Sequence, residues 1–487
     1  MSGLARATIA VTLAGALIAA WACATNPVTG ERQFTVISEA QEVQIGQAAD
    51  AELRQSLGVY DDPELQGYIE DIGNRLAQRS ERPHLPWKFG IVDSAAVNAM
   101  ALPGGPVYVT RGMLAYLNDE AELAGVMGHE VGHVTARHAV QQASKGTAAQ
   151  LGIVLATIFF PEAAPYGDLA GTGLSLLFLK HGRDAERESD RLGARYAAAN
   201  GWDPEGVVDM LRTLSRLSET SDRKGIPSWL STHPEPASRV AEVQPIVSTL
   251  RAEQAGEPAR NRDEYLARID GVVYGDNPRE GVVRGHAFLH PDLRFALEFP
   301  PDWTVANGPT QVVAQEPGGR AALILQLVPQ PRGGTLAEVA EWSMNQAGFR
   351  SRGGRQARIN GLDAYVGTWE GNVQGLGRSA ARAAVIDSER RVYRIIGVAS
   401  VEEFARTVGD FDGSIGSFRP LSRDEAAAIG PNRITFYRAR EGDTWQGIAV
   451  GPSEGIVSAA TLALMNGYAV NELPRAGDRL KVVKAEK

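Results

Sequence analysis

The chain contains little of what several protein classes require. Among its 487 residues there is one cysteine, Cys23, so an intrachain disulfide and a cysteine-rich zinc finger are both excluded. Asp and Glu outnumber Lys and Arg by 58 to 49, and a net charge of -9 does not suit a protein that wraps nucleic acid. We therefore expect no nucleic-acid partner, and any metal site must be built from His, Asp and Glu.

Long hydrophobic runs are also scarce beyond the amino terminus. Residues 151–179 contain two apolar runs, and neither reaches the roughly 18–20 residues that a bilayer-spanning helix needs. We interpret this segment as buried helix or an apolar lid, with insertion into a membrane as the alternative. The composition, 44% hydrophobic and 22% charged, is typical of globular domains and excludes a polytopic membrane protein.

The amino terminus has the features of an export signal. Arg6 precedes an apolar stretch, and Ala20-Trp21-Ala22 has the small-x-small form of a cleavage site directly before Cys23. This arrangement resembles a bacterial lipoprotein signal, which implies a signal peptide at residues 1–22 and a lipid on Cys23. Simple secretion and an uncleaved amino-terminal anchor are the alternatives, and all three place the remaining chain outside the cytoplasm.

Pattern and composition predict a multidomain α+β protein. The expected parts are a mainly helical domain at 23–249, a linker at 250–285, an α+β module at 286–419 and a small terminal module at 432–487. In the first domain, residues 38–82 have helical spacing and short strands are expected within 84–93 and within 101–110, the second turned by Pro103-Gly104-Gly105. Helices are expected at about 182–199 and 204–219.

The strongest chemical signal is His129-Glu130-Val131-Gly132-His133, an H-E-x-x-H motif on a helix that begins near Asn118 or Asp119. Residues four apart lie on one helix face, so two imidazoles can bind one tetrahedral zinc while Glu130 reaches a water on the metal. Gly125, Gly128 and Gly132 lie in the same helix. They indicate small-residue packing of a second helix, or a substrate backbone that comes close.

A catalytic zinc site needs a third protein ligand and an open fourth position. The segment from His181 to Asp190 is the best source, because Glu186 and Asp190 share one helix face and Asp190 could hold the outer nitrogen of a ligand histidine. Periodicity alone does not choose between Glu186 and Glu188. His138 is five residues beyond His133 and is expected to point off the ligand face, either at the surface or behind the ligands.

Taken together, these motifs resemble the gluzincin family of CAAX prenyl endopeptidases and HtpX-type proteases, and most closely its bacterial periplasmic lipoprotein branch. The residues that carry the resemblance are the segment Cys23 to Gly30, the segment Val97 to Gly105, His129 to His133, the helix from Arg183 to Gly193, and Thr232-His233-Pro234 with Arg239. The resemblance covers roughly residues 23–245. It implies a mainly helical zincin-type protease domain with one Zn²⁺ per chain.

Residue by residue, the resemblance assigns roles to the matching positions. His129, His133 and Glu186 correspond to the zinc ligands, Glu130 to the general base and Asp190 to the supporting carboxylate. His233 corresponds to a histidine that assists the transition state or sits over the zinc. Two further assignments are that Arg239 could help to stabilise the oxyanion, and that the strand at Asn98 and Ala99 could hold an extended peptide at a sheet edge.

The family resemblance also implies a function, an endopeptidase that acts on unfolded or misassembled proteins of the bacterial envelope. The expected location is the periplasm, with lipid on Cys23 as the membrane anchor. The outer membrane is slightly favoured because Ala24 stands where some lipoproteins carry an inner-membrane aspartate. Two alternatives are a chaperone-like assembly factor with a latent zinc site and an adaptor tethered to peptidoglycan.

The two carboxy-terminal modules offer weaker signals. The segment from Phe295 to Trp303 and the strands after it resemble a PsbP-type module, with an unrelated α+β domain as the alternative. Residues 433–483 resemble LysM, a small βααβ fold that binds peptidoglycan. Either this module binds glycan, or it only packs on its own protease.

Overall fold

The computed structural model describes residues 23–35, 37–143, 182–220, 229–308, 311–328, 334–373 and 376–486. The predicted signal peptide and the apolar segment 151–179 lie outside the described residues. In the described part, no helix combines the length and the apolar character that crossing a membrane requires. The chain forms two compact units. Of the described residues, the first unit comprises those within 1–221, 227–272 and 434–482, and the second comprises those within 273–433 and 483–487.

The first unit is built around a small sheet and a larger set of helices. Its three-stranded sheet has the order β3 (Lys88–Val92), β5 (Pro106–Thr110), β4 (Ala99–Ala101), in which β3 and β5 are parallel and β4 is an antiparallel edge strand. A two-stranded sheet joins β1 (Cys23–Thr25) and β2 (Arg32–Phe34). The helices are α2 (Glu39–Leu57), α3 (Pro63–Gln78), α4 (Arg111–Tyr116), α5 (Glu120–Thr135), α7 (Arg183–Ala199), α8 (Glu205–Thr220), α9 (Trp229–Thr232), α10 (Pro236–Glu253) and α11 (Arg262–Arg268).

Most of these elements were foreseeable from local signals. The strands predicted within 84–93 and 101–110 are confirmed as β3 and β5, and the helices near 182–199 and 204–219 are confirmed as α7 and α8. Residues 38–82 are helical as predicted and form two helices, because α2 ends just before Gly58, whose φ of 69° is left-handed, and Asp62 caps α3 with Pro63 in its first turn.

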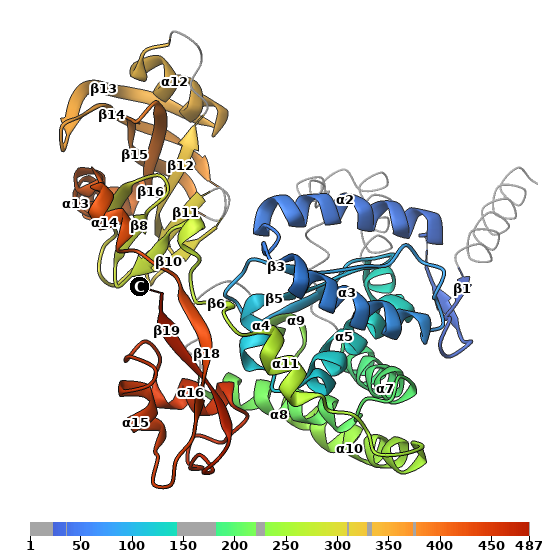
Figure 1. Cartoon of the computed structure of the whole chain (residues 1–487). Helices are drawn as coiled ribbons and strands as arrows, with labels where there is room; N and C mark the ends of the chain where they lie inside the picture. Colours follow the sequence, from blue (N-terminus) through green and yellow to red (C-terminus); the bar gives the residue numbers. More distant parts are fainter. Residues whose placement is uncertain are drawn as a thin grey trace, which may run out of the picture. The chain divides into compact units, whose positions relative to one another are not determined.

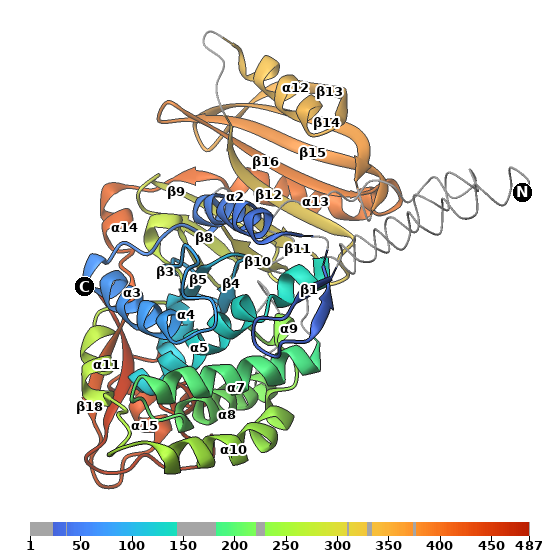
Figure 2. The ribbon, with the colours of Figure 1, turned by 90° about the vertical axis from the view of Figure 1, so that its right-hand side faces the viewer.

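Helix α5 lies at the centre of the first unit. Every one of its residues from Glu120 to Thr135 is buried, and α7 and α8 pack directly against it. Helix α10 in turn packs on α7 and α8, and Figure 2 shows these three helices running side by side. Residues 250–285, expected as a linker with some helix, contain α11, whose Tyr265 donates a hydrogen bond to Leu114 O at 2.7 Å.

The terminal module has the predicted β-α-α-β order. Its elements are β18 (Asn432–Arg438), α15 (Trp445–Val450), α16 (Ala459–Met465) and β19 (Arg479–Ala485), with β18 and β19 adjacent in one sheet beside β6 (Val273–Tyr274). Residues Ile434–Val482 belong to the first unit. Arg216 of α8 donates to Gly467 O at 2.8 Å, and the fully buried Lys481 donates to Leu117 O, just ahead of α5.

The second unit contains a seven-stranded antiparallel sheet covered on both faces. Neighbouring residues of one strand belong to different cores, since Val385 packs with Met344 of α12 (Leu336–Gln346) while Ile386 packs with Phe411 of α13 (Val401–Ser417). Figure 1 shows the two helices on opposite faces of this sheet. Its order is β10 (Thr304–Asn307), β11 (Gln311–Gln315), β12 (Ala321–Val328), β16 (Arg391–Ser400), β15 (Gly377–Ser388), β14 (Leu362–Val373), β13 (Phe349–Ile359).

A smaller sheet completes the second unit. Its order is β17 (Arg419–Pro420), β9 (Phe295–Glu298), β8 (Ala287–His290), β7 (Val282–Arg284), and the short helices are η3 (Pro278–Glu280) and α14 (Arg423–Ala427). Phe295 and Leu297 of β9 belong to the same core as Phe411. The unit is therefore an α+β module, as the sequence predicts for residues 286–419.

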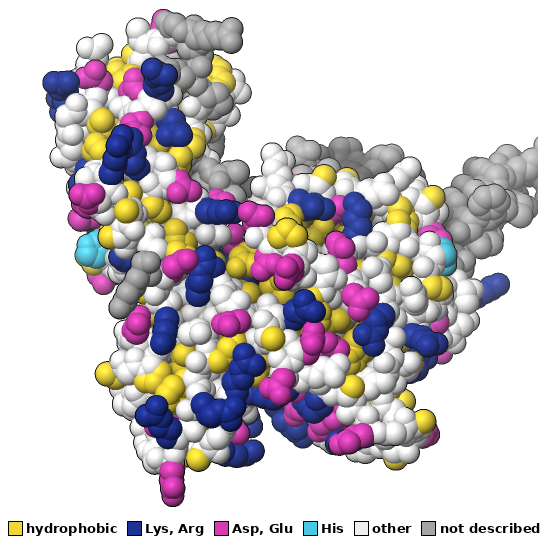
Figure 3. Space-filling model, in the orientation of Figure 1, with side chains coloured by type: hydrophobic (Ala, Val, Ile, Leu, Met, Phe, Trp, Pro, Cys, Tyr) yellow, Lys and Arg dark blue, Asp and Glu magenta, His cyan; other side chains and the backbone are white. Residues whose placement is uncertain are grey.

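Charged side chains on the surface are mixed in sign. Figure 3 shows Lys and Arg side chains interspersed with Asp and Glu over the visible face. Many form exposed ion pairs, such as Arg183 with Glu235 at 2.6 Å, and such pairs contribute little to stability.

Candidate metal centre

Helix α5 presents both imidazoles of the H-E-x-x-H motif on one face. The side chain of Asp119 caps the helix by accepting a hydrogen bond from Glu122 N at 2.9 Å. One turn apart, His129 and His133 bring their Nε2 atoms to 3.0 Å, and both residues are buried. The helix therefore aims two ring nitrogens at a single point.

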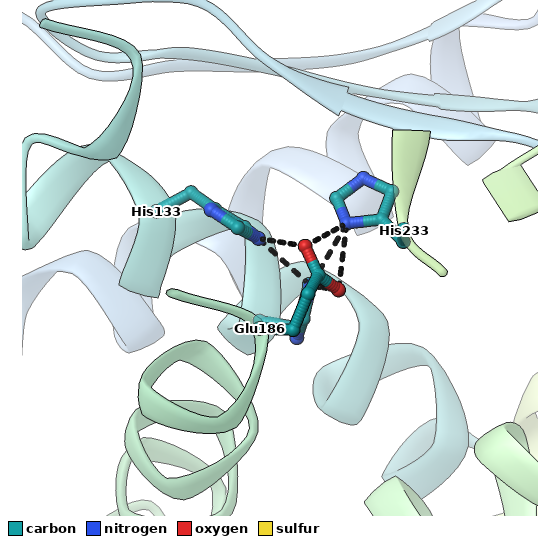
Figure 4. A group of neighbouring side chains, drawn as sticks. His133, Glu186 and His233 are labelled. Carbon is teal, nitrogen blue, oxygen red and sulfur yellow. Dashed lines mark hydrogen bonds and ion pairs between the residues drawn. The ribbon is translucent and has the colours of Figure 1, made fainter. Parts of the chain in front are cut away.

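Helix α7 brings a carboxylate to the same point. Glu186 is fully buried, with Oε2 3.6 Å from His129 Nε2 and Oε1 3.4 Å from His133 Nε2. Figure 4 shows its carboxylate projecting from α7 between His133 and His233. Glu188 instead contacts His138, so the structure places Glu186, and not Glu188, with the two imidazoles.

The geometry fits a zinc ion. With metal-ligand bonds of about 2.0–2.1 Å, the ligand atoms of a tetrahedral zinc lie about 3.3 Å apart, and the three separations among His129, His133 and Glu186 are 3.0 to 3.6 Å. Buried lone pairs that face one another repel unless a cation or a proton lies between them. Two imidazole nitrogens and a carboxylate are also the donor types that zinc prefers.

The electrostatics of Glu186 agree with this picture. Burial by itself would raise the pKa of the Glu186 carboxyl, but the charge of His233 and hydrogen bonds from His133 and His233 hold that pKa well below its ordinary value. The side chain is therefore an anion at neutral pH, which is the form that binds a metal.

Asp190 and Arg239 support the ligands from behind. Asp190 Oδ1 accepts a hydrogen bond from His129 Nδ1 at 2.9 Å, which leaves the Nε2 lone pair of that ring free for a metal. Burial would raise the pKa of Asp190, but the guanidinium of Arg239 and the bond from His129 keep it below its ordinary value.

The contacts of Arg239 bear on its predicted role. Its guanidinium lies 2.6 Å from Asp190 Oδ1 and 2.6 Å from Glu186 Oε2. These contacts favour the orientation of two carboxylates over the predicted contact with an oxyanion, because the guanidinium is already hydrogen-bonded to Asp190 and ion-paired with Glu186.

His233 lies on the other side of the ligand group. It follows α9, its ring stacks on Trp229 at a centroid distance of 4.6 Å, and its Nδ1 is 3.1 Å from Glu186 Oε1 and 3.2 Å from His129 Nε2. Burial would lower the pKa of His233, but Glu186 and Glu130 raise it above its ordinary value. His233 thus forms, with His129, His133 and Glu186, a buried group whose ligand atoms lie within 4.8 Å of one another.

Glu130 faces this group from α5. The residue is 1% exposed, and its Oε1 lies 3.4 Å from Trp229 Nε1 and 3.6 Å from His233 Nε2. Its carboxylate is therefore beside the ligands without being one of them, as a general base on a water requires.

The other predicted site residues lie outside this group, at the edge strand β4 and in β1. Ala99 is the first residue of the edge strand β4, which contacts α5, and Asn98 directly precedes it. In the same segment, Val97 O accepts a hydrogen bond from Trp229 N at 3.0 Å. The sheet edge therefore runs past the candidate site. Cys23 is the first residue of β1.

Known proteins match the part of the chain that contains the candidate metal ligands. Residues 63–247 match the model of Peptidase family M48. The chain is 32% identical over 256 residues to the beta-barrel assembly-enhancing protease of Escherichia coli (strain K12), a match that covers 50% of this chain and 51% of that protein. It is 30% identical over 239 residues to the mitochondrial metalloendopeptidase OMA1 of Danio rerio, a match that covers 46% of this chain and 50% of that protein.

These matches cover only part of each chain. The chain spans about half the length of the curated relatives it matches. A solution structure of cyanobacterial PsbP from Synechocystis sp. PCC 6803 aligns with 29% of this chain and 96% of its own, at 14% identity and a TM-score of 0.24. The PsbP-like and LysM-like assignments therefore stay predictions.

Proposed function

We propose that this chain is a metalloendopeptidase of family M48 that holds one zinc ion with His129, His133 and Glu186 and hydrolyses peptide bonds of unfolded or misassembled envelope proteins. The observation that carries the proposal is the convergence of two Nε2 atoms and one carboxylate at the spacing of a zinc tetrahedron, with Glu130 beside them.

The chain's own residues divide the work of hydrolysis. When bound, zinc lowers the pKa of a water molecule and polarises the scissile carbonyl. Glu130 takes the proton of the attacking water and passes it to the leaving amine nitrogen. Asp190, held by Arg239, keeps the proton of His129 on Nδ1.

Substrate would lie along the edge of the small sheet. Among the strands that the structure describes, β4 pairs with β5 on one side only, so an extended peptide can add to its other side with main-chain hydrogen bonds. Asn98 and Ala99 stand at the start of that strand, on the segment that also contacts α9. His233 would donate a hydrogen bond to the oxyanion of the tetrahedral intermediate from the ring nitrogen that now faces Glu130.

We place this activity in the bacterial periplasm. Support comes from the lipoprotein-like sequence before Cys23, from the matched Escherichia coli protease, whose name ties it to beta-barrel assembly, and from the acidic net charge, which argues against a nucleic-acid partner. Lipid on Cys23 would hold the protein at a membrane, with the outer membrane favoured. Replacement of Cys23 by Ala should abolish incorporation of labelled palmitate and release the protein from the membrane fraction.

The test of the peptidase uses the purified full chain. Elemental analysis should find one zinc per chain, and the protein should cleave an unfolded substrate such as casein. Glu130→Gln should keep the zinc and lose at least about a hundredfold in rate, since general-base catalysis contributes about 10²–10⁴-fold. Glu64→Gln, an exposed carboxylate of α3, is the matched control. A chain without zinc, or a Glu130→Gln variant with wild-type rate, contradicts the proposal.

One observation favours a second candidate, a latent site in an assembly factor. A catalytic zinc needs an open coordination position, yet His233 Nδ1 lies within 3.2 Å of His129 Nε2 and Glu186 and so stands where that position is expected. In this arrangement four protein groups would hold the metal, and no position would be left for water. The site would then be closed until a partner withdraws His233.

The variant His233→Ala separates the two candidates. If His233 keeps the site closed, the variant cleaves casein faster than the wild type. If His233 only assists the transition state, the variant is slower. An assembly factor that needs no cleavage would support envelope assembly equally well as wild type and as Glu130→Gln.

The peptidoglycan-tethered adaptor rests on the LysM-like pattern of the terminal module alone. Retention of the full chain on peptidoglycan sacculi tests it. Full retention with no casein cleavage would favour the adaptor over the peptidase.

A further inference from the structure

A histidine that is not a ligand lies directly behind one of the ligands. His138 Nδ1 is 2.9 Å from His133 Nδ1, and the two rings meet edge to face at a centroid distance of 4.9 Å and an angle of 74°. His138 is 6% exposed. No role for His138 follows from the H-E-x-x-H pattern, because that pattern ends at His133.

A break in the helix puts His138 there. On a continuous helix, a residue five positions after His133 would be rotated about 140° away from it. Helix α5 ends at Thr135, Arg137 has a φ of 61°, and residues 138–143 are helical again. The left-handed residue turns the chain so that His138 folds back onto the buried side of His133.

The turn at Arg137 is held by buried contacts. A non-glycine residue in the left-handed region is strained, so the surrounding structure must fix it. Arg137 Nε donates to Glu42 Oε2 at 2.8 Å and its Nη2 donates to Ile37 O at 2.9 Å. Glu42 is itself paired with the fully buried Arg82 at 2.9 Å. Two segments far apart in sequence thus stabilise the bend that positions His138.

The far side of His138 contacts a carboxylate. Its Nε2 lies 3.0 Å from Glu188 Oε2, and Glu188 is two residues along α7 from the ligand Glu186. An ionised carboxylate only accepts hydrogen bonds, so this contact requires the proton of His138 on Nε2. The Nδ1 of His138 is then an acceptor, and the 2.9 Å contact requires the proton of His133 on its own Nδ1.

We propose that His138 and Glu188 are positioning residues that fix the tautomer and the ring orientation of the ligand His133, in the way that Asp190 fixes His129. The inference rests on the zinc site proposed above. Hydrogen bonds run from His133 Nδ1 to His138 Nδ1 and from His138 Nε2 to Glu188, and they leave the Nε2 lone pair of His133 directed at the metal.

The two supports differ in chemistry. His129 donates to an anionic carboxylate that is clamped by Arg239, whereas His133 donates to a neutral imidazole whose carboxylate is one residue further away. A hydrogen bond to a charged acceptor is stronger than one to a neutral acceptor. His133 is therefore the ligand whose orientation depends on two successive contacts.

Four variants of the full chain test the proposal through zinc affinity, measured by competition with a chelator at one fixed pH. His138→Leu removes the acceptor, and Glu188→Lys replaces an acceptor by a donor, which forces the proton of His138 onto Nδ1 against that of His133. Both should weaken zinc binding by roughly 10–100-fold. His138→Gln and Glu188→Gln keep an acceptor oxygen and should stay within about threefold of the wild type.

The matched control is His84→Leu, which removes an exposed histidine that also contacts a glutamate, Glu39, at 3.0 Å. Its zinc affinity should equal that of the wild type. Ring-nitrogen NMR shifts of the eight histidines give a readout independent of affinity, and His138 should show its proton on Nε2.

Three results would overturn the proposal. They are wild-type affinity in His138→Leu, an equal loss in His138→Gln and His138→Leu, or a proton on Nδ1 of His138. If His138→Leu does not fold without metal, the Glu188 pair decides, because the Glu188 side chain is 16% exposed and that of His138 only 5%. A wild type that binds no zinc refutes the metal site itself, whereas a wild type that binds zinc as well as all four variants refutes only this support.

Discussion

Gly128 of α5 and Gly193 of α7 face each other with no space for a side chain between them. A Cβ atom at Gly128 would lie 3.0 Å from Gly193 Cα, and one at Gly193 would lie 2.8 Å from His129 N. Gly132 meets Ser189 Cα at 3.1 Å in the same way. These glycines set the distance between the helix with the two imidazoles and the helix with Glu186. Of the two interpretations that the sequence allows, packing of a second helix is the one that the structure contains.

Gly193→Ala should therefore push α7 away from α5. The added methyl group would meet backbone atoms of α5, which cannot rotate aside as a side chain can. We therefore expect a loss of about 1–3 kcal/mol in stability together with weaker zinc binding. The control is Gly67→Ala in α3, where no atom lies within 4 Å and helix propensity should add up to about 1 kcal/mol. Denaturant unfolding with and without zinc measures both, and equal stability of the two variants would contradict the argument.

Asp190→Asn should weaken metal binding without removing a ligand. The carboxylate accepts from His129 Nδ1 at 2.9 Å and from Arg239 at 2.6 and 2.7 Å, and an amide in its place would turn an N–H toward one of these donors. The expected loss in zinc affinity is about 10–100-fold. Asp184→Asn, on the exposed side of the same helix, should bind zinc as the wild type does.

Lys481→Met should destabilise the first unit. The substitution leaves Leu117 O without its hydrogen-bond donor and removes the ammonium group near the buried Glu122, which keeps Arg260 at 3.9 Å, at a cost of roughly 1–3 kcal/mol. Adding Glu122→Gln should give a loss that differs from the sum of the two single losses, since the amine of Lys481 and the carboxyl group of Glu122 interact. Urea unfolding followed by tryptophan fluorescence tests this, with the exposed Lys484→Met as control. Purely additive effects would show that the two groups do not interact.

Stability should also depend on pH through Glu122. Burial, and then the charge of Asp119, raises the pKa of Glu122 from 4.5 to about 8, and burial lowers the pKa of Lys481 from 10.5 to about 7. From about pH 5 to 7, Lys481 is charged in both states, while the unfolded chain loses the Glu122 proton that the folded chain keeps. The wild type should therefore lose about 2 kcal/mol relative to Glu122→Gln across this interval.

Above about pH 7, the titration of Lys481 changes the stability of the folded chain in the opposite direction. Folded Lys481 is neutral while the unfolded chain still holds the proton, so its contribution to stability rises with pH up to the ordinary value of 10.5. A wild type whose stability relative to Glu122→Gln does not change with pH would contradict the assignment.

Sequence predicted those parts of the site whose geometry is local. The spacing of His129 and His133 places them together on any regular helix, and Asp119 marks its start. The choice of Glu186 over Glu188 needed the family resemblance, because it depends on how α7 is rotated against α5. That rotation follows from the glycine contacts, which involve residues about 60 positions apart.

Other features left no signal that periodicity could detect. The position of His138 depends on a left-handed arginine, and the contacts that hold Arg137 come from Ile37 and Glu42, far away in the chain. The burial of Lys481 is equally hidden, since a lysine between apolar residues of a terminal strand has the pattern of a solvated position. Both features are set by tertiary contacts that override local preference.

The buried ammonium beside the start of α5 has a consequence for protein engineering. A chimera that exchanges the carboxy-terminal module would inherit a cavity under Leu117 unless the donor sequence also supplies a long cation at the position of Lys481. Deletion from residue 432 onward would likewise expose Asn118, which now packs beside Gly467. A loss of cleavage after such a deletion would therefore result from destabilisation of the first unit and not from the loss of a glycan-binding module.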